Sequence, residues 1–214
     1  MVQPNPTPVY RIVHIDNLDT LLARNALHSP NHTPNDGRVY RTIHDVGIQS
    51  VRSERQIGCG PRGVIHDYVP FYFGPRSPML LQLHTGRVPG YSERQDPLIY
   101  LVSSVQSFYS RKLPFVFSDG HGIKAFTKWF DSLDHLSRVD WEAVYAERWN
   151  DTIEDMDRQR RKQAEFLVHR SCPWEVIETI GVLDQAIEKN VKSILRSHPH
   201  ELTRPVEIKP DWYY

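Results

Sequence analysis

The sequence lacks the features that define several common classes of protein. It contains only two cysteines, Cys59 and Cys172, which lie far apart in the chain. Two distant cysteines do not form a disulfide framework, so we expect free thiols in a reducing compartment. The eleven histidines are scattered, and no cluster of cysteines and histidines has the spacing of zinc ligands. We therefore expect neither a disulfide-rich extracellular module nor a metal site.

Signals for membranes and for export are also missing from the sequence. No apolar run approaches the length that crosses a bilayer. The first residues, rich in proline, match neither a signal peptide nor an amphipathic transit segment. We expect a soluble, cytoplasmic protein that makes no contact with a membrane.

An excess of charge of either sign is absent as well. The chain has 26 basic and 26 acidic residues and a formal net charge of zero. This balance argues against a protein that coats nucleic acid non-specifically, because such binding rests on neutralising phosphates. A local basic groove is compatible with it.

The usual phosphate-binding and hydrolytic motifs are missing too. There is no G-x-x-x-x-G-K-[ST]. Gly58, Gly60 and Gly63 have the spacing G-x-G-x-x-G, but no predicted strand precedes them, so we interpret this stretch as a flexible turn. The sequence contains neither G-x-S-x-G nor H-E-x-x-H. Hydrolase triads and zinc-dependent chemistry are therefore disfavoured.

What is present is enough material for a substantial core. The chain has 214 residues, of which 11% are aromatic, and large aromatic side chains bury much surface each. No repeat or linker interrupts it, so we expect one domain over residues 1–214, with residues 1–8 as an extended lead-in because they hold three prolines.

The hydrophobic pattern predicts short strands throughout, with helices concentrated early and late. Asp16 and Asp119 are expected helix N-caps. The expected strands are 9–13, 79–83, 98–102, 115–117 and 176–183, and the expected helices are 18–24, a weak one within 39–55, 121–130, a short one from Asp140, and 185–196. Because strands do not alternate regularly with long helices, this pattern favours an α+β fold over a doubly wound sheet.

One carboxylate, Glu165, falls in an apolar run that is predicted to be a strand. Strand alternation places Ala164, Phe166 and Val168 on one face and Glu165 with Leu167 on the other. An acid in a strand is disfavoured by propensity. By itself, Glu165 is interpreted as an edge charge or a solvated salt bridge with the basic run before it; the alternative is a fixed carboxylate in a cleft.

Three other residues are equally ordinary when taken singly. His14 at the end of a strand can bond local backbone, Arg52 can be a solvated arginine, and His121 can be a helix first-turn residue without a special role. The aromatic run 68–73 is expected to divide by alternation, with Tyr68, Pro70 and Tyr72 on one face and the other three residues on the opposite face.

Taken together, these segments resemble the DarT family of DNA-targeting ADP-ribosyltransferases, which are toxins of toxin–antitoxin pairs. The resemblance spans nearly the whole chain, with the segments in the expected order. It rests on R-I-V-H-I-D-N (11–17), H-D-Y-V-P-F-Y-F (66–73), P-x-S-P-M-L (75–80), P-F-V-F-S-D-x-H (114–121), Q-A-E (163–165) and W-Y (212–213).

The resemblance implies a split, mostly antiparallel β-sheet core flanked by helices, with NAD as co-substrate in the cleft and no metal. It implies an enzyme that modifies thymidine bases in single-stranded DNA at a short sequence motif. It assigns catalytic roles to Glu165, Arg52 and His121, and it places at the NAD site His14, Asp16, Asn17, Asn31, Arg52 and Phe71. The implied partners are single-stranded DNA and a macrodomain antitoxin of the DarG type, and we expect a monomer.

DNA binding by a neutral protein requires a local basic surface with side chains that stack on unpaired bases. Arg76, Met79, Arg94 and Arg148 are the residues that we expect to contact DNA. The charged segment before Glu165 is expected to form one wall of the DNA groove.

The chemistry of such a site is consistent with these residues. Cleavage of the NAD glycosidic bond develops positive charge on the ribose, and a carboxylate facing that charge favours the transition state. The thymine nitrogen must also lose a proton. Arg52 either assists that removal directly or stabilises the deprotonated base electrostatically, and Glu165 is a candidate relay for the proton; because arginine stays protonated, the electrostatic role is at least as plausible.

Three other functions are compatible with the sequence. The acceptor could be protein or RNA, the chain could be a nucleic-acid-binding module without catalysis, or it could hydrolyse NAD without an acceptor. The retention of His14, Arg52 and Glu165 argues against the second of these.

Overall fold

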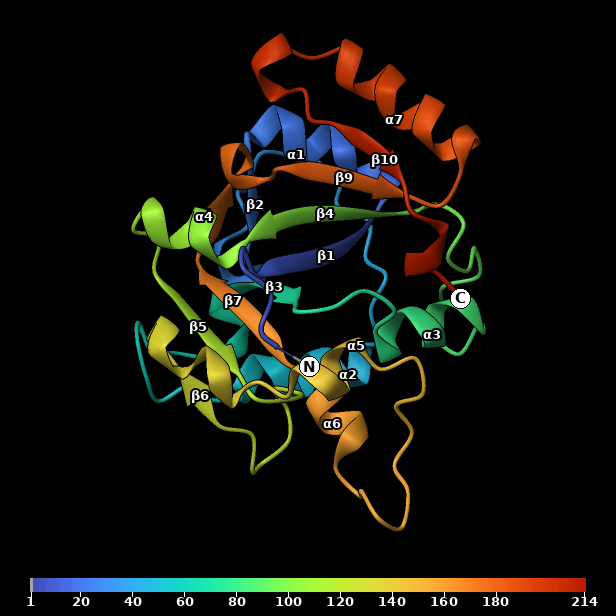
Figure 1. Ribbon diagram of the computed structural model, residues 1–214. Helices are drawn as coiled ribbons and strands as arrows, with labels where there is room; N and C mark the ends of the chain where they lie inside the picture. Colours follow the sequence, from blue (N-terminus) through green and yellow to red (C-terminus); the bar gives the residue numbers. More distant parts are fainter. Residues whose placement is uncertain (1) are drawn as a thin grey trace.

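The computed structural model describes residues 2–214, and it contains one large sheet, one small sheet and seven α-helices in that range (Figure 1). The strands are β1 (Pro8–His14), β2 (Ala26–His28), β3 (Tyr68–Tyr72), β4 (Leu98–Ser104), β5 (Phe115–Ser118), β6 (Trp129–Phe130), β7 (Glu165–His169), β8 (Ser171–Pro173), β9 (Thr179–Val182) and β10 (Val206–Ile208). The helices are α1 (Leu18–Arg24), α2 (Val46–Glu54), α3 (Pro78–His84), α4 (Val105–Ser110), α5 (Trp141–Tyr145), α6 (Arg158–Lys162) and α7 (Gln185–Arg196).

The large sheet has eight strands in the order β10-β9-β4-β1-β3-β7-β5-β6, and β2 pairs with β8 in a second, two-stranded sheet. Neighbours in the large sheet are antiparallel except for β9 and β10. In the described chain, β1 pairs with β4 along all seven of its residues but meets β3 at a single register position, Tyr10 with Tyr72. The sheet therefore splits between β1 and β3, which confirms the expected α+β, mostly antiparallel architecture.

Both faces of the sheet are covered. The main core lies where α1 and α7 pack on the face that carries Val9 and Val13, and these two helices lie side by side in Figure 1. On the other face, Tyr10 and Ile12 pack against α3 and against the C-terminal Tyr213. The aromatic tail thus closes the second layer, and α7 with its Asp184 N-cap closes the first.

The aromatic strand β3 divides as its alternation predicts. Val69, Phe71 and Phe73 enter the main core, whereas Tyr68 packs in a separate cluster on the opposite face. Phe71 is almost fully buried and meets the ring of Phe108 edge-on, with centroids 5.4 Å apart. The burial of both faces anchors β3 in the centre of the molecule.

Two elements differ from the sequence prediction. Residues 79–83 form helix α3 and not a strand, because the Ser77 hydroxyl accepts a hydrogen bond from the backbone N–H of Leu80 and Pro78 occupies the first turn. Residues 121–130 form a loop and the short β6, not a helix. The carboxylate of Asp119 accepts from the backbone N–H of Lys128 and so closes a turn instead of capping a helix.

Several boundaries also differ. Asp16 is not an N-cap: the His14 ring caps a short 3₁₀ helix by accepting from the backbone N–H of Asp16, and Asn17 precedes α1. The weak helix predicted within 39–55 begins only at Val46, with Asp45 as its cap. The strand predicted over 176–183 is confined to β9.

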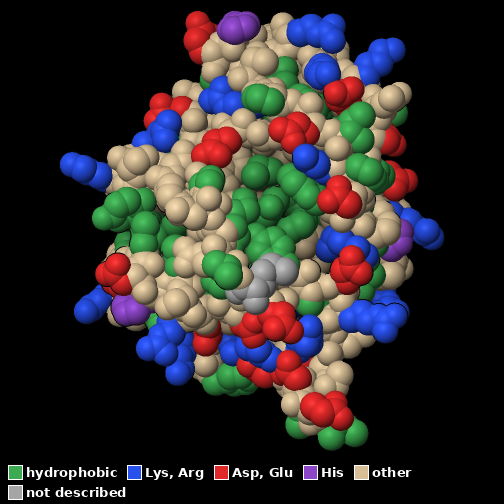
Figure 2. Space-filling view, viewed as in Figure 1, with side chains coloured by type: hydrophobic (Ala, Val, Ile, Leu, Met, Phe, Trp, Pro, Cys, Tyr) green, Lys and Arg blue, Asp and Glu red, His purple; other side chains and the backbone are tan. Residues whose placement is uncertain are grey.

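The charged segment before β7 is folded onto the protein. Arg160 pairs with Asp119 and Asp157, and Arg161 pairs with Asp140, Asp155 and Asp157. The ammonium of Lys162 is buried and donates to the backbone oxygens of residues 144 and 146 at 2.7 and 3.0 Å. Figure 2 shows opposite charges interleaved in the lower part of the molecule. Arg160, Arg161 and Lys162 of the basic run therefore have internal partners, and Arg160 also lines the cavity described below.

Within residues 2–214, the model contains no helix with the length and apolar character needed to cross a membrane. In the same range, no three or more histidine, cysteine or acidic side chains converge as metal ligands would.

Gly181 provides a test of how the aromatic tail is seated. A Cβ at this position would lie 2.4 Å from the Trp212 ring. We expect Gly181→Ala to lower the free energy of unfolding by about 1–3 kcal/mol, because the tail must shift or strain. Urea unfolding measures this, with Gly58→Ala as the control because no atom lies within 4 Å of its Cβ position. Equal stability of both variants would show that the tail does not pack on β9.

Candidate active site

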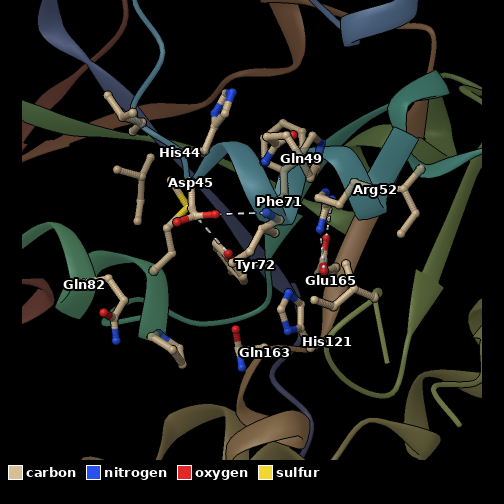
Figure 3. Close-up of a pocket in the computed structure, with 18 of the residues that line it drawn as sticks. His44, Asp45, Gln49, Arg52, Phe71, Tyr72, Gln82, His121, Gln163 and Glu165 are labelled. Atoms are coloured by element: carbon tan, nitrogen blue, oxygen red, sulfur yellow. Dashed lines mark hydrogen bonds and ion pairs between the residues drawn. The ribbon is translucent and has the colours of Figure 1, made fainter. Parts of the chain in front are cut away.

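A cavity of about 590 Å³ opens where β1 and β3 diverge. Its wall includes residues of β1, β3 and β7, of helices α2 and α3, and of the loop after β5 (Figure 3). This volume lies within the usual range of small-molecule sites. The cavity brings together six of the residues predicted from the sequence, namely Asn17, Arg52, Phe71, Met79, His121 and Glu165.

A buried ion pair stands at one end of this cavity. Arg52, from the last turn of α2, donates to both carboxylate oxygens of Glu165, the first residue of β7, at 3.0 and 2.8 Å. The two side chains are 9% and 2% exposed, and Figure 3 shows them facing each other. The interpretation of Glu165 as a solvated edge charge is therefore wrong, and so is that of Arg52 as a solvated arginine.

The loop after β5 holds the carboxylate in place from the other side. The backbone N–H of Gly122 donates to Glu165 Oε1 at 3.0 Å. The Ser118 hydroxyl accepts from the backbone N–H of Glu165 at 3.1 Å and donates to the carbonyl of Gly120 at 2.7 Å. A Cβ at position 122 would lie 3.1 Å from Ile65 and Trp129 and 3.2 Å from Glu165 Oε1, so a side chain here would require these neighbours to shift slightly.

The pair keeps both groups ionised. Burial alone would raise the pKa of Glu165, but the adjacent Arg52 guanidinium outweighs it and the pKa lies below its ordinary value. Burial likewise opposes the charge on Arg52, and the Glu165 carboxylate more than compensates, so the pKa of Arg52 is raised. Arg52 therefore stays protonated, and the structure gives it no capacity to act as a literal base.

His121 lies half-buried beside the ion pair. Its backbone N–H donates to the carbonyl of Arg160 at 2.9 Å, and its ring points into the cavity next to Glu165 (Figure 3). Burial lowers the pKa of the imidazole; Glu165 opposes that effect and Arg52 adds to it. The ring is consequently neutral at pH 7 and can accept a proton.

Of the predicted NAD residues at the end of β1, Asn17 lines the cavity, whereas His14 and Asp16 lie outside its wall. His14 is 2% exposed; its Nδ1 accepts from the backbone of Asp16, and its Nε2 bonds Glu93 at 2.9 Å. Asn17 uses its whole amide on Arg41, donating to the carbonyl at 2.8 Å and accepting from the N–H at 2.6 Å. Arg41 also pairs with Asp16 and Glu93. These contacts hold Arg41, which lines the cavity, against the residues that follow β1.

Two other predicted NAD residues have structural partners. Asn31 is exposed and donates to Asp67 at 2.9 Å, outside the cavity wall. Phe71 borders the cavity, but most of its ring belongs to the core.

The residues predicted to contact DNA lie mostly outside the cavity. Met79, in the first turn of α3, lines it and accepts a hydrogen bond from the Tyr72 hydroxyl at its sulfur. Arg76 is half-buried, with its guanidinium 4.8 Å from the centre of the Tyr214 ring. Arg94 and Arg148 are exposed and have no acidic partner within residues 2–214. Arg76 precedes α3 and Arg94 follows it, whereas Arg148 lies between α5 and α6, and none of the three is part of the cavity wall.

Sequence reasoning missed several polar residues of the wall: His44, Asp45, Gln49, Gln82 and Gln163. Gln49 follows Asp45 by one helical turn and bonds the His66 ring at 3.0 Å. Burial, together with nearby Arg11 and Arg52, lowers the pKa of His44 to about 4. Gln163 has a sequence signal, because it lies two residues before Glu165. His44, Asp45 and Gln49 stand in a stretch without a clear hydrophobic period, and Gln82 lies in the apolar run that is predicted to be a strand.

Comparisons with known proteins agree with this geometry. The family model described as "ssDNA thymidine ADP-ribosyltransferase, DarT" matches residues 10–214. A DNA ADP-ribosyl transferase from Thermus sp. (strain 2.9) is 42% identical over 211 residues, which cover 99% of this chain and 98% of that protein.

Two solved structures are also similar. Thermus sp. 2.9 DarT in complex with ADP-ribosylated ssDNA has a TM-score of 0.93 and 41% identity, covering 100% of this chain and 99% of that chain. Thermus sp. 2.9 DarT in complex with NAD+ has a TM-score of 0.88 and 40% identity, covering 100% of both chains. The fold and the cavity are those of an ADP-ribosyltransferase. The chain belongs to the DarT family of single-stranded DNA thymidine ADP-ribosyltransferases.

The ion pair makes a prediction about stability. Glu165→Leu leaves the buried Arg52 charge uncompensated, and we expect it to lower the free energy of unfolding by about 3–5 kcal/mol at pH 7. The double variant Arg52→Met/Glu165→Leu should recover most of that loss, because no charge is left buried. Urea unfolding of both single variants, the double variant and the wild type measures the coupling. Additive losses would mean that the two side chains do not stabilise each other.

The coupling should also depend on pH with a definite sign. The folded pKa of Glu165 is depressed, so its contribution is present above the unfolded value of about 4.3 and is lost as the pH falls through the folded pKa. A coupling that strengthened on acidification would contradict the assignment.

Proposed function

We propose that this chain transfers one ADP-ribose unit from NAD to a thymidine base in single-stranded DNA, in a sequence-specific manner, and that Glu165, Arg52 and His121 form its catalytic group. The observation that carries the proposal is the buried Arg52–Glu165 pair in the wall of a cavity, in a chain of this family. The Thermus structures with NAD+ and with ADP-ribosylated DNA support the choice of both substrates.

Glu165 has one acceptor position left for substrate. Oε1 already accepts from Arg52 and from Gly122, whereas Oε2 accepts from Arg52 alone. A carboxylate oxygen takes about two hydrogen bonds, so Oε2 is the atom that would hold a ribose hydroxyl of NAD. Its charge would stabilise the positive ribose while the bond to nicotinamide breaks and nicotinamide departs as a neutral molecule.

The acceptor nitrogen of thymine must lose its proton as it bonds to the ribose. Because His121 is neutral and beside Glu165, its ring nitrogen is a suitable proton acceptor. Arg52, which stays protonated, would stabilise the negative charge that develops on the thymine. We thus propose an electrostatic role for Arg52 and the role of base for His121.

The other assignments complete the proposal. His14, Asp16, Asn17, Asn31 and Phe71 would shape the NAD site, the first three through the Arg41 network. DNA would leave the cavity over Met79 towards Arg76, Arg94 and Arg148.

At the cellular level, we propose a toxin within the pentosyltransferase group of glycosyltransferases, because the bond formed is to a ribose carbon. It would act as a monomer in the cytoplasm, with a macrodomain antitoxin of the DarG type as partner and residues 1–214 as one catalytic domain.

The central test is mass spectrometry of a thymidine-containing single strand after incubation with NAD. We expect the mass of one ADP-ribose to be added on a thymidine, and no addition with Glu165→Ala. Double-stranded DNA, RNA and bulk protein are the parallel acceptors. Labelling of RNA or protein in preference to DNA, or release of free ADP-ribose at the same rate with and without DNA, would replace the proposal.

Arg52→Lys separates the roles of the pair further. Lysine keeps the charge but cannot bridge both oxygens of Glu165, so we expect transfer to fall by about 100-fold or more, as for loss of one preorganised electrostatic contact. Near wild-type transfer would remove Arg52 from the mechanism. Circular dichroism controls for the fold.

The pH dependence tests the base. His121 is neutral above its lowered pKa, so the rate of transfer should fall only at pH values below the ordinary imidazole value of about 6.5. His121→Gln should be slower and should lack this acidic limb. If the variant kept the same limb in single-turnover measurements, a different group would be the base.

A further inference from the structure

Large apolar side chains are exposed around the mouth of the cavity. Phe126 is 63% exposed, Met156 is 81% exposed, and Ile48 is 38% exposed. All three belong to the cavity wall, and each comes from a different segment: the loop after β5, the segment before α6, and α2. Exposed apolar groups that gather at one place mark an interaction site.

The loop that carries Phe126 is held firmly. Arg55 donates to the carbonyls of Lys124 and Ala125 at 3.1 and 3.0 Å. The Thr127 hydroxyl donates to the carbonyl of His121 at 2.7 Å. The exposure of the Phe126 ring is therefore imposed by bonds on both of its sides, and it is not the result of a free loop.

The ring also has a fixed support. The guanidinium of Arg160 lies 5.0 Å from the centre of the Phe126 ring. Arg160 is itself locked by two bonds of 2.7 Å to Asp157 and one of 2.7 Å to Asp119. An aromatic ring with a cation on one side is a sequence-tolerant platform for an unpaired base, because every base has a π-face.

We propose that Phe126 is a stacking platform for a nucleotide that flanks the target thymidine, on the side of the cavity opposite α3. This inference rests on the proposed function, and it extends the DNA contacts to a segment that carries none of the predicted ones. Figure 3 shows His121, from the same loop as Phe126, and Gln82, from α3, on opposite sides of the cavity. A strand whose target base enters the cavity would run from the α3 side to the Phe126 side.

The occupant is an unpaired base for two reasons. The platform is continuous with the cavity that would receive the target thymidine, so a flanking nucleotide reaches it without a second binding event. The acidic side chains beneath it, Asp119 and Asp157, are both paired with Arg160, which weakens their repulsion of a phosphate backbone relative to free carboxylates.

The first experiment compares Phe126→Ala, Phe126→Trp and Tyr109→Ala in steady-state transfer to a single-stranded oligonucleotide. Tyr109 is the matched control, because it is 61% exposed and lies on α4, outside the cavity wall. We expect Phe126→Ala to raise the KM for the oligonucleotide about 10-fold, the effect of losing one stacked base. Phe126→Trp should restore it, Tyr109→Ala should match the wild type, and the KM for NAD should change less than about twofold.

The second experiment locates the base. Abasic sites are introduced one at a time on either side of the target thymidine, and each oligonucleotide is tested with wild type and with Phe126→Ala. At one position the abasic site should weaken the wild type about 10-fold and cause no further loss in the variant. Additive losses at every position, or a parallel rise in the KM for NAD, would overturn the inference and leave Phe126 as a support of the catalytic loop. If the wild type modified no oligonucleotide, the proposed function itself would fail.

Discussion

The buried pair of Arg52 and Glu165 is the interaction on which the site depends. Its two members are 113 positions apart, and they meet only if α2, β7 and the loop after β5 are all in place. Bringing two charges out of water is costly unless they are well paired and further hydrogen-bonded. Gly122 supplies that further bond to Glu165. The arrangement of three separate segments is thus tied to one electrostatic requirement.

The same pair explains why the cavity is suited to differential binding of a transition state. In the ground state the carboxylate and the guanidinium compensate each other. As the glycosidic bond breaks in the proposed reaction, the positive charge of the nicotinamide ring would move to the ribose and face Glu165, and the thymine that loses its proton to His121 would face Arg52. Each group then gains a partner that the ground state does not offer, and the groups are already oriented, so little reorganisation is needed. The two fixed charges can therefore stabilise both the positive ribose and the negative thymine of the proposed reaction.

The elements with a plain local signal could be predicted from the sequence. The alternation of β3, the β7 strand that carries Glu165, and the amphipathic α7 follow from periodicity. The prediction for residues 79–83 is wrong because an apolar run of that length does not distinguish a strand from a buried helix. The Ser77-Pro78 pair that begins α3 is also common in turns. Residues 121–130 have helical spacing, but tertiary bonds from Arg55 and Arg160 hold them as a loop.

The site was predictable only in part for a related reason. Glu165, Arg52 and His121 were found through the family resemblance, since each is ordinary when taken alone. The resemblance assigns His14 to the NAD site, and in the structure its two ring nitrogens are bonded to Asp16 and Glu93. The sequence around His14 gives no indication that a residue as distant as Glu93 bonds its ring. A sequence motif therefore locates a site more reliably than it distinguishes the residues that touch a ligand from those that position them.

The structure shows how the basic residues of this chain, whose net charge is zero, are distributed between internal partners and the surface. Arg160 and Arg161, which lie close to Glu165 in sequence, form ion pairs with internal carboxylates. Lys162 is buried and donates a hydrogen bond to a backbone oxygen. They serve to fix the loop and strand of the site and are not available to phosphates. In the proposed interface, DNA binding would rely on a few arginines without acidic partners and on stacking at the cavity mouth. Because counterion release scales with the number of phosphates neutralised, such an interface gains its affinity mainly from unpaired bases, and this favours single strands over duplex DNA.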